Sequence, residues 1–388
     1  QIPAIRFNGF TDAWEQRKLG EFADISTGKL DANAMVEDGE YDFYTSGMKK
    51  YRIDTPAFEG PAITIAGNGA TVGYMHLADG EFNAYQRTYV LQNFQANRYF
   101  LYSEISKKLP RKIAQEARTG NIPYIVMDML TELTISLPVL EEEQAKIGAF
   151  FKQLDNTIAL HQRELDNLKI TKQVFMKKMF PKEGEKVPEV RFPGFMADWD
   201  YRKLGDVGET YTGLSGKSKD DFGHGRGKYV TYMNVFSNSI ANPSLVELVE
   251  IDTKQNEVNP GDIFFTTSSE TPEEVGMSSV WLENSDNTYL NSFCFGYRPI
   301  EKFDNYYLAY MLRSSVVRKK ITFLAQGISR YNISKNKVMD IAVPIPVIEE
   351  QTKIGEFFKQ LDDIINLQQQ ELEKLKQTKQ AFLQKMFI

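Results

Sequence analysis

Two stretches of the sequence gather basic side chains among amide and aromatic residues, a pattern whose chemistry is the binding of phosphate groups. Residues 98–118 hold six basic residues and two acids, and residues 305–339 hold seven basic residues and no acid. By contrast, residues 245–286 hold ten acids and one lysine. The net charge of −6 and the pI near 5.4 argue, taken alone, against a nucleic-acid binder. Because the charge is segregated, the two basic strips still predict phosphate contacts, although a solvated helix face would carry the same residues.

The candidate phosphate contacts are the lysines and arginines of the two strips. In the first strip they are Lys107, Lys108, Arg111, Lys112 and Arg118, and in the second they are Arg318, Lys319, Lys320, Arg330 and Lys335. Asn121 and Tyr124 accompany the first strip, and Tyr331 and Asn332 accompany the second.

The sequence carries no recognisable catalytic motif. It has no P-loop, dinucleotide-binding glycine motif, zinc-protease helix or nuclease-type carboxylate cluster, and His76, His161 and His224 lie in unrelated contexts without metal-ligand spacing. The single cysteine, Cys294, excludes an intrachain disulfide. No apolar run is long enough to span a membrane and no secretory signal is seen, so the cytoplasm is the expected compartment. We therefore expect a protein without catalysis, metal or cofactor of its own.

An internal duplication organises the chain. The segment from Ile5 through Trp14 to Glu21 matches the segment from Val190 through Trp199 to Asp206, at an offset of 185 residues. A longer match, between 146–180 and 353–387, has an offset of 207 residues. The sequences between these paired blocks differ heavily. Two similar frames that carry two divergent inserts predict one task performed twice on two different ligands, with a purely structural repeat as the alternative.

Each copy ends in a predicted long helix, over 141–180 and 347–388. Both helices begin with acidic residues and lack an interior proline, which favours uninterrupted helices. Their apolar residues alternate in steps of four and three, the spacing of a coiled-coil seam with polar residues in mid-seam. The predicted seam consists of Ile147, Phe151, Leu154, Ile158, His161, Leu165, Leu168 and Phe175, and of Ile354, Phe358, Leu361, Ile365, Gln368, Leu372, Leu375 and Phe382.

The connectivity predicts how these parts are arranged. Residues 1–140 and 190–346 read as α+β domains with twisted, mostly antiparallel sheets, with helices near 97–116 and 304–325 and a linker over 181–189. Because domain termini tend to lie close together, the second long helix should run back along the first. The expected fold is α+β, with two domains at opposite ends of an antiparallel two-helix coiled coil and an approximate two-fold repeat. Phe150 and Phe357 lie off the seam and are expected to need partners.

The paired motifs resemble those of the specificity subunits of Type I restriction–modification systems. The relevant motifs are Arg-Phe-x-Gly-Phe…Trp…Arg-Lys-Leu-Gly and Pro-Val-Leu/Ile-Glu-Glu…Gln…Lys-Ile-Gly…Phe-Phe…Leu-Asp, each present twice and in the same order. The resemblance implies that each variable domain is a target recognition domain for half of a split double-stranded DNA sequence. It further implies that the helices set the spacing and dock two methylation subunits, which restriction subunits join. S-adenosylmethionine, ATP and Mg²⁺ would be bound by those partners.

If the chain reads DNA, amide and guanidinium groups in loops must reach base edges. Asn68, Asn121, Arg330 and Asn332 are the candidates for this role. The other basic residues would hold phosphates and fix the register without reading sequence. The alternative interpretations are a protein-binding coiled-coil scaffold without DNA specificity and an enzyme with an unfamiliar motif.

Overall fold

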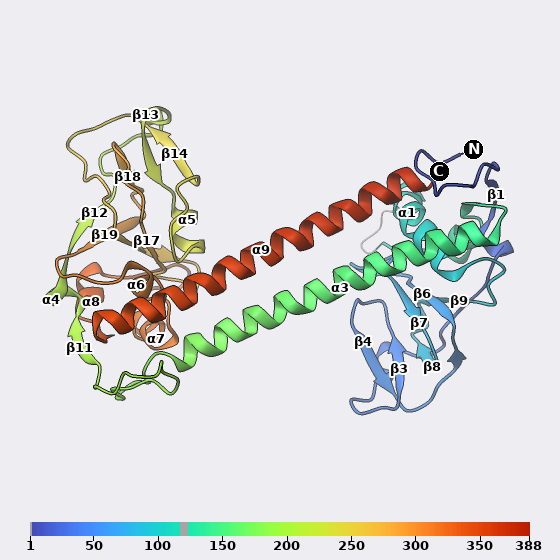
Figure 1. Ribbon diagram of the computed structural model, residues 1–388, viewed down its shortest axis with the longest axis horizontal. Helices are drawn as coiled ribbons and strands as arrows, with labels where there is room; N and C mark the ends of the chain where they lie inside the picture. The colour runs from blue at the N-terminus through green and yellow to red at the C-terminus, as the bar shows by residue number, and fades with distance from the viewer. Residues whose placement is uncertain (1, 117–122) are drawn as a thin grey trace. The chain divides into compact units, whose positions relative to one another are not determined.

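The computed structural model describes residues 2–116 and 123–388 and divides the chain into two compact units. Unit 1 comprises Gln1–Arg163 with Gln369–Ile388, and unit 2 comprises Glu164–Gln368. Both long helices, α3 (Glu141–Lys178) and α9 (Ile348–Met386), therefore contribute one part to each unit. Figure 1 shows the sheets of each unit beside the helix parts that belong to it.

Unit 1 combines two four-stranded sheets with helices. Its sheets have the orders β2-β9-β6-β7 and β4-β3-β8-β5, and β1 pairs with β10. The bounds are β1 Glu15–Lys18, β2 Asp24–Thr27, β3 Tyr41–Tyr44, β4 Lys50–Ile53, β5 Phe58–Glu59, β6 Ala62–Ala66, β7 Met75–Ala78, β8 Glu81–Ala84, β9 Thr88–Gln92, β10 Thr134–Leu137, α1 Arg98–Glu116 and α2 Met127–Thr131. The pairing is antiparallel except between β3 and β8, so the expected sheet type is correct for most strands.

Unit 2 repeats this plan with insertions. Its main sheet has the order β12-β19-β15-β17, a second sheet has the order β14-β13-β18 with β13 and β18 parallel, and β11 pairs with β21 and β16 with β20. The bounds are β11 Asp200–Lys203, α4 Leu204–Val207, β12 Gly208–Thr212, β13 Phe222–Val230, α5 Tyr232–Ser237, β14 Val246–Val249, β15 Ile263–Thr266, β16 Ser268–Ser269, β17 Ser278–Val280, β18 Thr288–Leu290, β19 Cys294–Pro299, α6 Asn305–Met311, α7 Ser315–Phe323, β20 Tyr331–Asn332, α8 Lys335–Met339 and β21 Ala342–Ile345.

One helix expectation needs correction. The helix expected near 304–325 is two helices, α6 and α7, whereas its counterpart near 97–116 is the single helix α1. The break falls where Ser314 adopts an extended conformation and becomes the N-cap residue of α7. The Ser314 hydroxyl makes no capping hydrogen bond, so the break is set by the backbone conformation of this residue.

The repeated blocks build equivalent aromatic cores. In unit 1, the rings of Trp14, Phe100 and Phe151 surround Phe387, with centroid distances to Phe387 between 5.2 and 6.1 Å. In unit 2, Phe180 takes the place of Phe387 and contacts the rings of Trp199, Tyr307 and Phe358. These cores explain why tryptophan and the Phe-Phe pair recur in both copies.

A glycine in each repeated helix allows a close approach to the domain. A Cβ atom on Gly148 would lie 2.6 Å from Asn97 Oδ1, the oxygen that accepts bonds from the first turn of α1. A Cβ atom on Gly355 would lie 2.4 Å from the equivalent oxygen of Asp304, which accepts a bond from Tyr307. The Lys-Ile-Gly motif therefore lets each long helix pack against the start of the domain's own helix.

Within each unit, the two helix segments run antiparallel along the predicted seam. In unit 1, Lys379 pairs with Asp155 and the ring of Phe382 contacts Phe150. In unit 2, Lys172 pairs with Asp362 at 2.5 Å in the same way. All sixteen predicted seam residues are buried or half-buried. The expectation that Phe150 and Phe357 need partners is wrong, because Phe150 packs on Phe7 and Phe382, and Phe357 packs on Phe175 and Phe192.

Candidate recognition site

A short backbone bridge occurs at the same place in both units and brings predicted recognition residues together. In unit 1, Asn68 pairs with Tyr124 just after β6, and in unit 2, Ser268 pairs with Asn332 just after β15. The next residues make matching bonds, from Ile125 N to the Gly67 carbonyl and from Ile333 N to the Thr267 carbonyl. We call this position the bridge site of each unit. The register also shows that Tyr124 of unit 1 corresponds to Asn332 of unit 2.

In unit 1, the loop 45–49 is fastened to the bridge site. Ser46 Oγ donates to Asn68 Oδ1 at 2.5 Å, and the Thr71 hydroxyl donates to the Ser46 carbonyl. The His76 ring lies 3.2 Å from the Gly47 carbonyl through Nε2. The same loop exposes Met48 and ends at the exposed Lys49. The surroundings of Asn68 are therefore rich in hydrogen-bonding groups.

In unit 2, helix α5 takes the place of that loop. Strand β13 runs parallel to β18 as β3 does to β8, and α5 follows β13 as the loop follows β3. The Tyr232 hydroxyl of α5 donates to the Ser268 carbonyl at 2.7 Å, and Arg330 donates to Ser268 Oγ at 3.2 Å. A pocket of about 690 Å³ opens here; among its lining residues are Tyr232, Phe236, Ser268, Glu270, Glu274 and Arg330. The unit-2 site is thus a hollow with two carboxylates and one exposed arginine.

Two half-buried arginines from the basic strip hold the walls of this pocket. Arg313 donates to the carbonyls of Val235, Phe236 and Asn238 at the end of α5, and to the Ser278 carbonyl. Burial lowers the pKa of Arg313 to about 10, so its guanidinium stays charged at neutral pH. A charged donor fixed to several carbonyls fastens α5 to the main sheet.

Arg318 fastens the opposite wall. Its guanidinium donates to the carbonyls of Glu273, Val275 and Gly276, in the loop that also carries Glu274. Burial lowers its pKa to about 10 as well. This geometry favours a positioning role for Arg318 over the phosphate contact expected from sequence, because its donors already face backbone carbonyls.

Several other predicted phosphate contacts are also engaged within the fold. Lys107 Nζ donates to the Phe387 carbonyl, and Lys320 Nζ donates to the Ala342 carbonyl. Lys108 bonds to the buried Glu104 and to Ser136, and Lys112 pairs with Glu116. The exposed Arg111 and Lys319 and the half-buried Lys335 keep the surface access that a phosphate contact needs. Arg118 and Asn121 lie outside the described residues.

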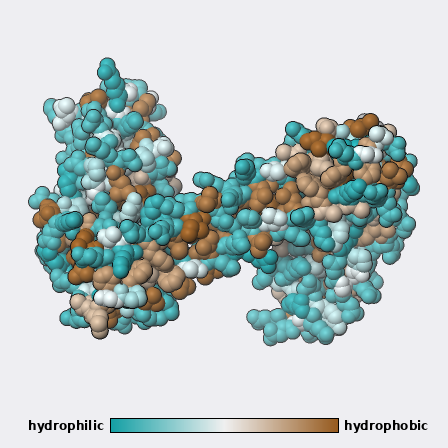
Figure 2. All heavy atoms as spheres, in the orientation of Figure 1, coloured by the Kyte–Doolittle hydropathy of each residue, from teal (hydrophilic) through white to brown (hydrophobic). Residues whose placement is uncertain are grey.

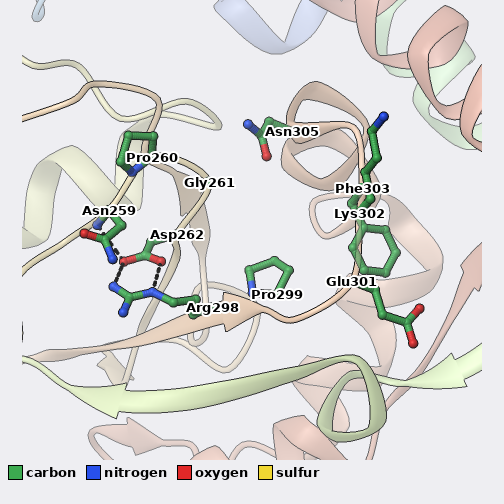
Figure 3. A pocket seen from close by; sticks show the side chains of 10 residues that line it. All are labelled: Asn259, Pro260, Gly261, Asp262, Arg298, Pro299, Glu301, Lys302, Phe303 and Asn305. Carbon is green, nitrogen blue, oxygen red and sulfur yellow. Dashed lines mark hydrogen bonds and ion pairs between the residues drawn. The ribbon is translucent and has the colours of Figure 1, made fainter.

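In a second hollow in unit 2, two charged lining residues pair with each other (Figure 3). Arg298 forms a bidentate ion pair with the buried carboxylate of Asp262 at 2.7 and 2.8 Å. Asp262 also accepts bonds from the Tyr211 hydroxyl and the Asn259 N–H, which closes the turn before β15. This hollow therefore has a structural explanation, and it lies at the end of β15 opposite to the bridge site.

Apolar side chains also reach the surface of the long helices, where brown residues interrupt the hydrophilic surface in Figure 2. Away from the seam, the exposed ones are Leu160, Ile170, Val174, Ile364 and Leu367. No helix among the described residues is long and apolar enough to span a membrane. Within the same part of the chain, no group of three or more His, Cys, Asp or Glu residues is arranged to hold a metal ion.

Comparisons with known proteins agree with this geometry. Residues 11–169 and 196–377 match the family described as Type I restriction modification DNA specificity domain. The chain is 34% identical over 181 residues to the Type I restriction enzyme EcoDI specificity subunit of Escherichia coli, a match that covers 46% of this chain and 40% of that protein. It is 24% identical over 415 residues to the Type I restriction enzyme MjaVIII specificity subunit of Methanocaldococcus jannaschii, covering 95% and 91% of the two chains.

A solved structure shares the fold. The S subunit of a Type-I restriction-modification system from M. genitalium matches with a TM-score of 0.67 and 17% identity, over 100% of this chain and 99% of that one. Two family matches, one in each copy of the duplication, together span most of the sequence. The chain therefore belongs to the family of Type I restriction modification DNA specificity domains.

Proposed function

We propose that this chain is the DNA sequence-recognition subunit of a Type I restriction–modification complex and that it reads a bipartite, asymmetric target. Unit 1 reads one half of the target and unit 2 reads the other. The observation that carries this proposal is the bridge site, which has the same backbone frame in both units but unlike side chains. Asn68 with the loop 45–49 occupies it in unit 1, and Ser268 with Arg330 and two carboxylates occupies it in unit 2.

Phosphate contacts and base contacts have separate tasks in this proposal. Arg111, Lys319 and Lys335 contact phosphates and set the register of each unit on the duplex. Asn68, Arg330 and Asn332 reach base edges, where amide and guanidinium groups discriminate between bases. All these assignments remain predictions that substitution can test.

The two long helices act as the spacer and as the docking surface. The supporting observations are the burial of the predicted seam and the matched pairs Lys172–Asp362 and Lys379–Asp155. In this proposal the domains over 1–140 and 190–346 stand at opposite ends of a coiled coil formed by 141–180 and 347–388. The exposed apolar residues outside the seam would contact two methylation subunits, and restriction subunits would join through that complex.

The proposed subunit is not itself catalytic. S-adenosylmethionine, ATP and Mg²⁺ would be bound by the partner subunits, and the complex would work in the cytoplasm, where the DNA is. This division of labour fits a chain whose sequence carries no recognisable catalytic motif.

The direct test is to co-express the chain with its methylation partner and to map methylated adenines across the host genome. The expected result is a single bipartite motif with two different halves. A complex that forms but methylates no defined motif would contradict the proposal and favour a scaffold instead. Salt dependence gives a second readout, because DNA affinity that depends on Lys and Arg falls steeply as salt rises.

A further inference from the structure

We propose that Glu270 and Glu274 determine the specificity of unit 2 by accepting hydrogen bonds from the exocyclic amino group of a base in its half of the target. This inference rests on the proposed function and names the chemistry of one half-site. Both residues line the pocket at the unit-2 bridge site, together with Arg330 and Tyr232.

The position of the pocket connects it to recognition. Its walls come from α5, from β16 with the loop that follows it, and from the segment that leads into β20. The equivalent place in unit 1 is occupied by Asn68 and the loop 45–49. The pocket therefore lies where the two copies share a backbone frame and differ in side chains, as a specificity determinant must.

The charge of the pocket is unusual for a surface that meets DNA. Half of the ten acids of the 245–286 segment have their carboxylates bonded elsewhere; for example, Asp252 pairs with Lys217 and Asp262 pairs with Arg298. Among the residues that the structure describes, no cation pairs with Glu270 or Glu274, and Glu274 accepts only from the Ser269 hydroxyl at 3.2 Å. Carboxylates that face a polyanion without a cation are repelled unless they accept hydrogen bonds from it.

The donors that duplex DNA offers in its major groove define what these carboxylates can select. An ionised carboxylate only accepts hydrogen bonds, so it needs a donor on the base edge. Cytosine N4 and adenine N6 are such donors, whereas guanine O6 and N7 and thymine O4 are acceptors. The exposed guanidinium of Arg330, which lines the same pocket, has the complementary preference for guanine. The pocket thus combines two acceptor carboxylates with one donor guanidinium.

The walls are rigid enough for discrimination. Arg313 fixes the end of α5 through three carbonyls and joins it to Ser278 of β17 through a fourth, and Arg318 fixes the 273–276 backbone through three. A site held in place before binding loses less entropy on binding and rejects wrong partners more sharply. Arg313 and Arg318 are therefore positioning residues for Glu274 and for the aromatic wall of α5.

The experiment compares Glu270→Gln, Glu274→Gln and the double variant with wild type, each co-expressed with the methylation partner. Glu273→Gln is the matched control, because Glu273 is an exposed acid in the same loop but does not line the pocket. The mapped methylation motif is the readout, and thermal unfolding of each purified complex verifies that the variants fold.

The expected result is that the double variant loses discrimination at one or two positions in one half of the motif only. The ratio of methylation at the original sequence to methylation at the newly tolerated sequences should fall about ten- to hundredfold. The motif position at which discrimination is lost identifies the contacted base as cytosine or adenine. The control variant Glu273→Gln should keep the wild-type motif. A double variant that folds and retains the full motif would overturn this inference but leave the proposed function intact. If the wild-type complex methylates no defined motif, the proposed function fails first and this inference falls with it.

Discussion

The guanidinium of Arg191 forms a bidentate ion pair with the carboxylate of Glu350, at 2.7 and 2.8 Å, and the side chain of Glu350 is fully buried. The same pair recurs in unit 1, where Arg6 binds Glu143 at 2.6 and 2.7 Å. In both units the arginine comes from the Arg-Phe-x-Gly-Phe motif and the glutamate from the first turn of a long helix. The two repeated blocks of each copy are thus joined to each other by a buried charge pair.

Loss of the arginine should therefore destabilise unit 2 strongly. Arg191→Met leaves the Glu350 carboxylate buried without its counterion, which costs about 3–5 kcal/mol of unfolding free energy. Urea unfolding of the purified protein, followed by circular dichroism, measures this loss.

Arg202→Met is the matched control, because Arg202 pairs with Glu301 at 2.7 Å but both side chains stay in contact with solvent, with exposed fractions of 35% and 43%. Exposed ion pairs contribute about 0–1 kcal/mol, so this variant should unfold close to wild type. Equal losses in the two variants would contradict a special role for the buried pair.

Two adjacent cations on α7, Arg318 and Lys319, should contribute differently to the free energy of unfolding. Arg318→Gln removes a charged donor from three carbonyls, so it should lower stability by about 2 kcal/mol or more. Lys319→Gln changes an exposed side chain and should leave the unfolding free energy within about 0.5 kcal/mol of wild type.

The Lys319→Gln variant also tests whether Lys319 contacts a DNA phosphate. Lys319→Gln should weaken DNA binding equally for all sequences and reduce the slope of log affinity against log salt by about one. Binding isotherms at several salt concentrations supply that slope. An unchanged slope for Lys319→Gln would remove Lys319 from the set of phosphate contacts.

The pKa values of two histidines should be shifted in opposite directions from the ordinary value. Burial lowers the pKa of His76, which lies between the rings of Tyr44 and Tyr74, despite its bond to the Gly47 carbonyl. Bonds to the Asp220 carbonyl and the Glu250 carboxylate raise the pKa of His224. Histidine NMR titrations, assigned with His76→Gln and His224→Gln, should place the two pKa values on opposite sides of 6.5, the ordinary value.

The lowered pKa of His76 has a consequence for stability. As pH falls below about 6.5, the unfolded chain binds a proton at His76 before the folded chain does. Unit 1 should therefore lose stability on acidification until pH reaches the folded pKa, and His76→Gln should lessen that loss. If the variant shows the same acid sensitivity as wild type, another group is responsible.

The sequence predicts the parts of this fold that depend on local periodicity and on repetition. The seam from Ile147 to Phe175 and its counterpart from Ile354 to Phe382 could be identified because a buried helix face repeats in steps of three and four. The bridge site could not be assembled, because the pairing of Ser268 with Asn332 joins residues 64 positions apart in sequence through tertiary structure. Residue type alone nevertheless proposed Asn68, Arg330 and Asn332, which the fold places at the two bridge sites, and their contact with bases stays a prediction.

In the basic strips, residues of the same type have different environments that sequence cannot distinguish. Sequence treats Arg318 and Lys319 alike, yet only the fold reveals that one faces carbonyls and the other faces solvent. Glu270 and Glu274 were missed for the same reason, since an acidic segment reads as an unlikely contact for DNA until each acid's partner is known. What singles out Glu270 and Glu274 is their place in the pocket at the bridge site, which only the fold reveals.

The spacer role of the helices predicts how insertions should act. Seven residues inserted after Glu164 in α3 alone should weaken the packing of α3 on α9, because the partner segment keeps its length while the charge pairs Lys172–Asp362 and Lys379–Asp155 fix both ends. Seven residues inserted in both helices, after Glu164 and after Gln368, keep the seam in phase. The matched insertion adds about 10 Å of helix, equivalent to about three base pairs. The methylation motif of that variant should then keep both halves and gain about three unspecified positions between them. An unchanged gap in a folded, active complex would show that the helices do not set the spacing.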